Sequence, residues 1–371
     1  ADTFDNVTHE DTCIHKICGR CIPLNRTPVM IQGINDKNLQ EKIIIIGTAA
    51  FGQTNNQINS VLNALLVARV TKSSLFITAG SWAHGLLKLF LDEAGIQSFE
   101  QTFGARILHN PVNDKVNNYY KNNAQVSHMT GEDLFYYRRF HPNITSDQVR
   151  SIDRAFFEFF WLNAKSESCS SVNYFGLNQN EEPYTVIHSR RMNKQEGNCP
   201  TRILPLADRF WKSQKVHLDQ VTPCELPPLY VHSILIQNNL MYTTRNTTTS
   251  IDEATGQHLS SSPIYIITDG FNPYIIQNLK EDPLIGHRIY EVPDNKTIRW
   301  VVGDIMLGAL SSVFIGTPTS SMSGNIARAR TALGFDVKTN YLRPLEQAHN
   351  DSDVWEFLYD CDNMDAIPTC I

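Results

Sequence analysis

Short apolar runs alternate with amphipathic segments along most of this chain. The runs are rich in β-branched residues and are bounded by glycine or polar residues, as the buried strands of a parallel sheet are. They cover residues 42–47, 74–78, 184–189, 263–270 and 311–316. We expect each of these runs to form a buried strand.

Between these runs, apolar residues recur at helical spacing. Expected helices cover residues 58–69, 86–93, 146–163, 229–239 and 304–310, and a further helix begins near Asn325. The clearest is 146–163, where Ser146 can cap the helix. Its apolar stripe comprises Val149, Ile152, Ala155, Phe156, Phe159 and Phe160. Such a stripe is expected to be core rather than an aromatic ligand site. Alternating strands and helices predict an α/β fold with parallel sheets.

A length of 371 residues suggests two or three domains. Residues 1–40 are polar and cysteine-rich, which predicts an irregular N-terminal extension pinned to the body by disulfides. The first domain is expected over 41–165 and the second over 166–345. The junction between the two domains is expected at residues 166–171, which are mostly small and polar. Residues 346–371 form an acidic tail.

Charged residues follow the central predicted strand. His188, Arg190 and Arg191 stand at its C-terminal end, and ligands of α/β sheets bind at that end of the strands. The planar fork of an arginine fits two phosphate oxygens at once. Arg190 therefore predicts recognition of a phosphorylated ligand. The alternative is a salt-bridged pair of surface arginines.

Two further strand ends carry polar groups. Asp269 ends the strand at 263–270, where it could accept hydrogen bonds from a nucleobase or a ribose, or cap the next helix or turn. The strand at 311–316 runs into a hydroxyl-rich segment, 317–324. Hydroxyls and backbone N–H groups at a helix start form an anion site. The alternative is a helix cap alone, which needs one hydroxyl.

The loop after the first strand is rich in carboxamides. It spans 48–57 and includes Gln53, Asn55, Asn56 and Gln57. It is neither a P-loop nor a G-x-G-x-x-G fingerprint. Its side chains suit hydrogen bonds to a sugar or to an acceptor hydroxyl, and turn and capping chemistry is an equally good interpretation.

The composition and net charge of the chain limit the classes of partner that it can bind. Charged residues are 19% of the chain and the formal net charge is -6, which argues against a nucleic acid as the main partner. The longest aliphatic stretch is 43–46, so no transmembrane segment is expected. The chain begins at Ala1 without Met and is expected to be mature or trimmed.

Six Asn-x-Ser/Thr sequons predict passage through the lumen of the endoplasmic reticulum or Golgi, or secretion. They begin at Asn6, Asn25, Asn143, Asn246, Asn295 and Asn350. The eight cysteines would then form four disulfides. Zinc binding by Cys13, His15, Cys18 and Cys21, or a redox pair of Cys18 and Cys21, is less favoured. No second ligand pair has the usual spacing, and the flanks are not a βαβ unit.

The strand ends together resemble the GDP-fucose fucosyltransferase superfamily, which includes α1,6-fucosyltransferases and plant relatives, and most closely the protein O-fucosyltransferases. The resemblance spans about residues 42–335 and is carried by Gly47–Gln57, His188–Arg191, Thr268–Asp269 and Phe314–Ser323. It implies a GT-B fold: two Rossmann-like domains whose parallel sheets face a central cleft. The first domain would lie on the acceptor side and the second would bind the nucleotide sugar.

The resemblance also implies an activity. An inverting glycosyltransferase of this kind transfers fucose from GDP-fucose to a protein or glycan hydroxyl, with no metal and no cofactor. Arg190 would grip the β-phosphate and stabilise departing GDP, and Asn56 would face the fucose and the acceptor. An arginine fork and a helix N-terminus stabilise the charge that grows on a leaving diphosphate.

The other residues implied for donor binding are His188, Asp269, Ser320, Ser321, Met322 and Ser323. His188 and Asp269 would contact guanine or ribose, and the serines would bind phosphate. Met322 replaces a phenylalanine that is common near the base, and Asn193 stands where many relatives have an acidic residue. These departures leave two alternatives: a non-catalytic glycan- or protein-binding relative, and a transferase using a different nucleotide donor, such as a sulfotransferase.

Overall fold

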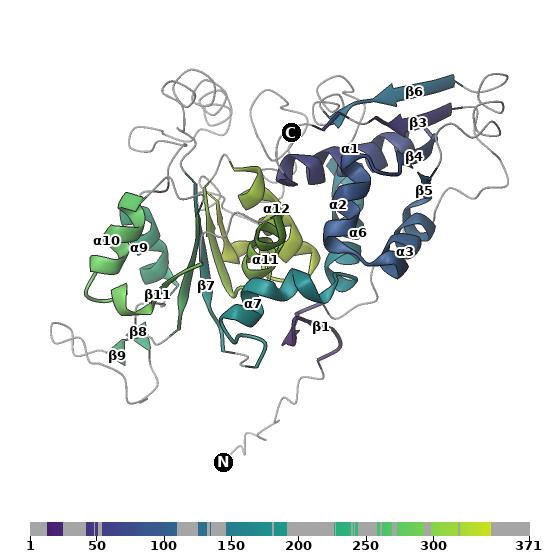
Figure 1. The fold of residues 1–371 in the computed structure, drawn as a ribbon. Coiled ribbons are helices and arrows are strands. Elements are labelled where there is room, and N and C mark those ends of the chain that lie inside the picture. The colour runs from purple at the N-terminus through teal and green to yellow at the C-terminus, as the bar shows by residue number, and fades with distance from the viewer. Residues whose placement is uncertain are drawn as a thin grey trace, which may run out of the picture.

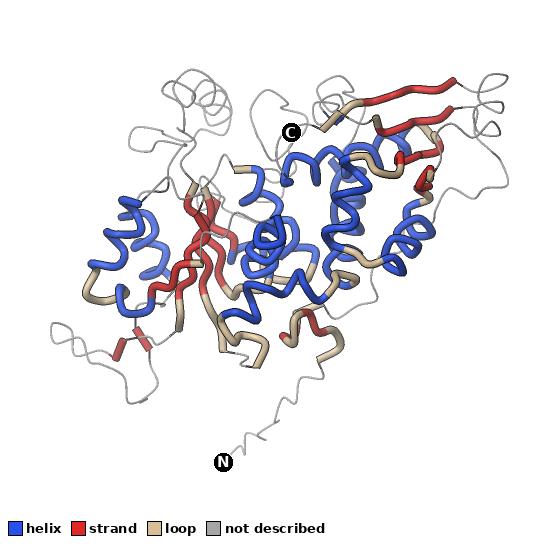
Figure 2. The backbone as a smooth tube through the Cα atoms, in the orientation of Figure 1, coloured by secondary structure: helices blue, strands red, loops and turns tan. Residues whose placement is uncertain are grey.

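The computed structural model describes residues 13–24, 42–47, 49–50, 54–109, 125–131, 134, 146–179, 182–190, 226, 228–238, 240, 242–243, 258–259, 262–268, 273–292, 298–317 and 320–342. Their helices and strands form two α/β units, and each unit is built on a parallel sheet (Figures 1 and 2). The predicted fold of two Rossmann-like α/β units is confirmed.

The first sheet contains the strands β3 (Lys42–Ile46), β4 (Ser74–Thr78), β5 (Ala105–Leu108) and β6 (Gln125–Met129), in the order β5-β4-β3-β6. All neighbouring pairs are parallel. The helices of this unit are α1 (Thr54–Val70), α2 (Trp82–Phe90) and α3 (Glu93–Phe103). The strands expected at 42–47 and 74–78 are confirmed.

The second sheet contains β7 (Thr185–Ser189), β10 (Ile264–Thr268), β11 (Ile289–Glu291), β12 (Val313–Gly316) and β13 (Asn340–Leu342). The order is β11-β10-β7-β12-β13, and again every neighbouring pair is parallel. All five residues of β7 are buried, because this strand is central in the sheet and covered on both faces. The three strands predicted here are confirmed.

Helices cover both faces of the second sheet. The pair α9 (Pro228–Gln237) and α10 (Pro273–Glu281) lies on one face, while α11 (Ile298–Ala309) and α12 (Ser321–Ala332) lie on the other (Figure 1). Side chains of β7 alternate between the two cores: Ile187 packs in the core beneath α9 and α10, and Val186 packs in the larger core beneath α11 and α12. A short antiparallel pair, β8 (Tyr242–Thr243) and β9 (His258–Leu259), lies outside the sheet.

The segment between the sheets forms α6 (Ser146–Leu162), a short 3-10 turn at Ser166–Cys169 and α7 (Ser170–Tyr174). Helices α1, α6 and α12 pack against one another between the two sheets (Figure 1). The apolar stripe of α6 is core, as predicted: Phe156 and Phe160 are at most 2% exposed and their rings stack with centroids 4.1 Å apart. The six-member stripe therefore holds the two units together rather than binding a ligand.

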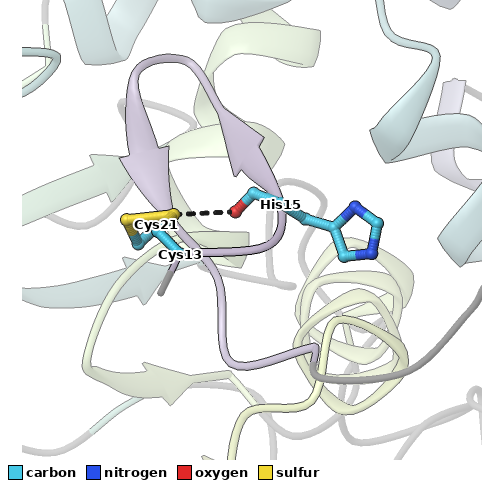
Figure 3. Close-up of a disulfide and its surroundings, with 3 residues drawn as sticks. All are labelled: Cys13, His15 and Cys21. Atoms are coloured by element: carbon cyan, nitrogen blue, oxygen red, sulfur yellow. Dashed lines mark hydrogen bonds between the residues drawn. A yellow bond between two sulfur atoms is a disulfide. The ribbon is translucent and has the colours of Figure 1, made fainter. Parts of the chain in front are cut away.

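The N-terminal extension is pinned as expected. Its hairpin of β1 (Lys16–Ile17) and β2 (Arg20–Cys21) is closed by a disulfide between Cys13 and Cys21 (Figure 3). A sulfur of this disulfide lies 3.4 Å from the His15 carbonyl oxygen, a contact rather than a hydrogen bond because a disulfide sulfur carries no hydrogen. A second disulfide ties Cys18 to Cys169.

These two disulfides exclude the alternative interpretation of the N-terminal cysteines as a redox pair, since Cys18 and Cys21 have different partners. Arg20 adds a polar anchor: its guanidinium donates to the carbonyl oxygens of Leu177 and Glu182 and lies over the Tyr184 ring. The remaining four cysteines and the six sequons lie outside the described residues.

Several element boundaries differ from the prediction. Helix α1 begins at Thr54 rather than at 58, and α12 begins at Ser321 rather than near 325. Their first turns lack an apolar stripe and are rich in small and hydrogen-bonding residues, which in sequence resemble a loop. The expected helix 86–93 spans the end of one helix and the start of another, because Asp92 caps α3 by accepting from the Gly95 N–H.

No strand was predicted between residues 78 and 184, and this is wrong for β5 and β6. Both are short and carry polar residues, so neither has the apolar run of a central strand. Within the described part of the chain, no helix combines the length and the apolar character that crossing a membrane requires.

Candidate active site

The strand order of the second sheet marks a place for a ligand. From β7 the chain adds β10 and then β11 on one side, and then returns to add β12 and β13 on the other. The switch point therefore lies between β7 and β12. In open α/β sheets, ligands bind in the crevice outside the C-terminal ends of the strands at this point. The residues that follow β7 and β12 are therefore the candidates.

Thr317 joins the ends of these two strands. Its buried hydroxyl donates to the His188 carbonyl oxygen at 3.0 Å and accepts from the Arg190 backbone N–H at 3.0 Å. Its own N–H also donates to the His188 carbonyl oxygen, at 3.1 Å. Thr317 thus fixes the backbone that carries Arg190, which is partly buried. Thr317 was predicted only as a member of the hydroxyl-rich segment 317–324, and its bridge between the two strand ends was not predicted.

His188 points from β7 to the first turn of α12. It is 2% exposed, and its Nδ1 lies 2.7 Å from the Ser323 hydroxyl, which is also fully buried. Burial, and then the positive charge of Arg190, lower the pKa of His188 to about 3. The imidazole is therefore neutral at neutral pH. It can orient Ser323 but cannot serve as a cation for a phosphate.

The close approach of α12 to β12 depends on Gly316. A Cβ built at Gly316 would lie 2.8 Å from the Ser323 Cβ, which is closer than any real contact of this kind. The lack of a side chain lets the first turn of α12 sit directly on the strand end. The start of this helix is thereby placed at the switch point.

The start of α12 has unfilled hydrogen-bonding capacity. Ser320 occupies the N-cap position, but its side chain accepts no hydrogen bond from the helix. Its hydroxyl is buried and has no hydrogen-bond partner among the residues that the structure describes. The N–H groups of a first helical turn have no acceptor within the helix. A buried hydroxyl and such N–H groups together can hold an anion, and Met322 packs on the core beside them.

Helix α1 meets α12 at this place. The Ser321 hydroxyl donates to Asn56 Oδ1 at 2.9 Å. Asn56 belongs to the first turn of α1, which follows β3. The first sheet has its own switch point between β3 and β6, and Ser60 of α1 binds the Gly131 carbonyl oxygen beyond β6 at 2.9 Å. The hydrogen bond between Ser321 and Asn56 therefore joins the helix starts at the switch points of both sheets.

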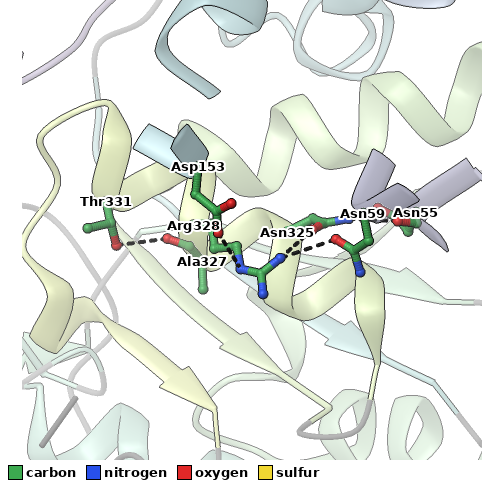
Figure 4. A network of polar contacts seen from close by, with 7 residues as sticks. All are labelled: Asn55, Asn59, Asp153, Asn325, Ala327, Arg328 and Thr331. Atoms are coloured by element: carbon green, nitrogen blue, oxygen red, sulfur yellow. Dashed lines mark hydrogen bonds and ion pairs between the residues drawn. The ribbon is translucent and has the colours of Figure 1, made fainter. Parts of the chain in front are cut away.

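A buried polar network continues this contact (Figure 4). Asn325 donates to the backbone oxygen and to the side-chain oxygen of Asn55, at 3.1 and 3.2 Å. Arg328 donates to Asn59 Oδ1 at 3.1 Å, and its Nε lies 3.5 Å from a carboxylate oxygen of Asp153 on α6. All five residues are buried. Of these five residues, only Asn55 was predicted to belong to a site, as part of the carboxamide loop.

The structure thus brings together most of the predicted site residues. The elements that carry these residues converge at the switch point of the second sheet, between β7 and β12. The residues are Asn56, His188, Arg190, Ser320, Ser321 and Ser323. Asp269 lies outside the described residues, as does Arg191. Among the described residues, no group of three His, Cys, Asp or Glu side chains could hold a metal ion.

Comparisons with known proteins give structural neighbours only. The chain matches no protein-family model and no curated protein sequence. Among solved structures, it is similar to POFUT1 in complex with GDP, with a TM-score of 0.43 and 13% identity over 80% of this chain and 96% of that chain. For POFUT1 in complex with GDP-fucose, the TM-score is 0.44 and the identity is 11%, over 81% of this chain and 96% of that chain.

A mutant of Arabidopsis thaliana FUT1 in complex with GDP is also similar, with a TM-score of 0.40 and 10% identity over 81% of this chain and 70% of that chain. These neighbours are fucosyltransferases. They are of the kind that the sequence motifs resemble.

Proposed function

We propose that this chain is a glycosyltransferase that uses a GDP-sugar, with GDP-fucose as the donor and a protein or glycan hydroxyl as the acceptor. One observation carries the proposal: the end of β7 with Arg190 and the uncapped start of α12 meet at the switch point of a doubly wound sheet. An arginine fork and helix N–H groups are suited to the two phosphates of a nucleotide sugar. The motif resemblance supports guanine and fucose over other bases and sugars.

In this proposal, Arg190 stabilises the leaving group. The bond between the fucosyl carbon and the β-phosphate oxygen breaks, and its electron pair stays on GDP. Negative charge then grows on the diphosphate, where Arg190 and the first turn of α12 act on it. The Ser320 hydroxyl gains a partner in a phosphate oxygen, which relieves the cost of burying it unpaired. The hydroxyl hydrogen of Ser321 is committed to Asn56, so Ser321 contributes its backbone N–H.

Asn56 acts as a hydrogen-bond donor to the sugar or diphosphate. Its Oδ1 accepts from Ser321, so its NH₂ group is the one that a ligand can meet. A carboxamide is not a base, and no acidic residue stands in the first turn of α1. The proposed reaction is therefore strongly dissociative: the fucosyl carbon becomes oxocarbenium-like, and a weakly nucleophilic hydroxyl attacks its opposite face. The acceptor proton passes to solvent, and the configuration is inverted.

We further propose that His188 and Asp269 contact guanine or ribose, with Met322 near the base. The Nδ1 of His188 is occupied by Ser323, so Nε2 is the nitrogen that a nucleotide would meet. Divalent metal has no part in this scheme. The two disulfides and the six sequons support a place in the secretory-pathway lumen.

A second candidate is a non-catalytic glycan- or protein-binding protein of the same fold. The lack of an acidic residue at the start of α1 favours it, because that helix then offers no general base. Such a protein would bind GDP-fucose or an acceptor without turnover.

The test is release of GDP from GDP-fucose in buffer with EDTA, measured with and without folded protein domains and oligosaccharides as acceptors. We expect release that is stimulated by an acceptor and abolished in Arg190→Ala. Binding of GDP-fucose without stimulated release by any acceptor would favour the second candidate. Release that needs a divalent metal would contradict metal-independent transfer.

A further inference from the structure

The contact between α1 and α12 is polar where helix contacts are ordinarily apolar. Asn55 and Asn59 of α1 face Asn325 and Arg328 of α12, and none of the four is more than 8% exposed. Buried polar groups cost free energy unless they are paired with good geometry. An apolar contact tolerates sliding of one helix over the other, whereas such hydrogen bonds are satisfied in one arrangement only.

The arrangement places the starts of two helices together. Ser321 and Asn56 belong to the first turns of α12 and α1 and are hydrogen-bonded to each other. A helix start carries roughly half a positive elementary charge, and two neighbouring starts therefore repel. The hydrogen bonds of the polar network hold the two starts together. On α1 they involve Asn55, next to Asn56, and Asn59, about one turn further along. On α12 they involve Asn325 and Arg328, about one and two turns beyond Ser321.

Arg328 is the centre of this polar network. It is 2% exposed and lies between Asp153 of α6 and the asparagines Asn59 and Asn325 (Figure 4). Its planar fork contacts three helices at once, which a lysine cannot do. Asp153 is 1% exposed and compensates the buried charge. Arg328 belongs to α12 of the second unit, and two of its partners, Asn59 and Asp153, belong to α1 and α6.

We propose that Arg328, with Asn325 and Asp153, is a positioning element that fixes α1 against α12, so that Asn56 is held at the donor phosphates. This inference rests on the proposed function for its catalytic consequence. The residues themselves do not touch donor or acceptor. Their loss should therefore leave GDP binding by the second unit nearly intact and impair the transfer step, which needs groups from both units.

Arg330 provides a matched control. It lies two residues further on α12, is also fully buried, and contacts Asn340 and Ser311 of the second unit instead of α1. Arg328→Lys and Arg330→Lys make the same chemical change at equal burial. Both keep the positive charge, so the Arg328 variant does not leave Asp153 unpaired.

Three measurements on the full chain test the inference: the Kd for GDP, kcat for transfer, and amide hydrogen exchange of residues 54–60. For Arg328→Lys we expect a Kd within about threefold of wild type, kcat lower by tenfold or more, and faster exchange at 54–60. For Arg330→Lys we expect a lower Tm with kcat and exchange at 54–60 unchanged. Asn59→Ala, which breaks the same contact from α1, should show the Arg328 pattern more weakly and serves if Arg328→Lys does not fold.

The outcomes separate this inference from the proposed function. A wild-type chain that neither binds GDP nor transfers sugar refutes the proposed function, and the exchange measurement still decides whether Arg328 fixes α1. Unchanged exchange at 54–60 in both the Arg328 and Asn59 variants overturns the inference. Faster exchange with wild-type kcat shows that the contact is structural and overturns the positioning role. The same loss of kcat in Arg330→Lys does so as well.

Discussion

Acid should destabilise this chain through His188, which is buried as the neutral imidazole. Its pKa is lowered from 6.5 to about 3 by burial, with the charge of Arg190 as the second cause. Between these two values the unfolded chain binds a proton that the folded chain does not, so stability falls as the pH falls. The contribution is fully present above pH 6.5 and is lost progressively toward pH 3.

The size of the effect follows from the shift. At 1.36 kcal/mol per pKa unit, going from pH 7 to pH 5 should cost about 2 kcal/mol through this group alone. Other groups titrate in the same range, so the measurement is a difference between proteins. His188→Gln removes the titrating ring and keeps a polar side chain at the position.

The assay is urea unfolding followed by tryptophan fluorescence at pH 7, 6 and 5. The wild-type protein should lose about 2 kcal/mol more than His188→Gln over this range. Ser323→Ala removes the partner of Nδ1 and keeps the buried ring. It should be less stable at every pH and retain the wild-type slope, because burial is the main cause of the shift. If the free energy of unfolding had the same slope against pH in wild type and His188→Gln, the buried neutral His188 would not be the cause of the acid destabilisation.

Other predictions concern the strand ends and the disulfides. Arg190→Lys keeps the charge and loses the fork, so kcat for transfer should fall by about a hundredfold, and by more than the affinity for GDP does. Near-wild-type turnover of the folded variant would contradict the role of Arg190. Thr317→Val removes two hydrogen bonds at the strand ends, so it should lower stability by about 1–3 kcal/mol and weaken GDP binding. Thr317→Ser keeps the hydroxyl and should retain wild-type stability and GDP binding. Equal behaviour of the two variants in calorimetry would contradict the role of the Thr317 hydroxyl. Replacing Cys18 and Cys169 by Ser opens a loop with a sequence separation of 151, and in the chain-entropy model this should lower the free energy of unfolding by about 5 kcal/mol. Replacing Cys13 and Cys21, which are separated by 8 residues, should lower it by about 2.5 kcal/mol. Equal losses in urea unfolding would show that the two disulfides act by local contacts instead.

The parts of this fold that could be predicted from sequence are those with a simple burial pattern. Strand β7 is buried along its whole length, and the β-branched residues Thr185, Val186 and Ile187 indicate a buried strand. Helix α6 has one apolar face, and that face is core. In both cases the apolar residues in the sequence mark buried positions, although α6 also buries Asp153, Phe157 and Glu158, which lie outside the predicted stripe.

The start of helix α1 was predicted wrongly because its burial pattern is not simple. Apolar spacing from Ile58 onward indicated one buried face, but Asn59, Ser60 and Asn63 are also buried. This helix lies between a sheet, α6 and α12, and its polar side chains are satisfied by partners far away in the sequence. The bridge made by Thr317 could not be predicted for the same reason, because it depends on strands β7 and β12 being neighbours. Interactions of this kind become visible only when the topology is known.

We expect GDP to bind at the switch point of the second sheet, beyond the C-terminal ends of β7 and β12. The most direct measurement is isothermal titration calorimetry of the wild-type chain with GDP and with UDP, each in buffer containing EDTA. GDP should bind at one site per chain without metal, UDP should not bind at the same concentrations, and Arg190→Ala should lose GDP binding while remaining folded. Binding of UDP but not GDP, or GDP binding that EDTA abolishes or that Arg190→Ala retains in full, would contradict the account.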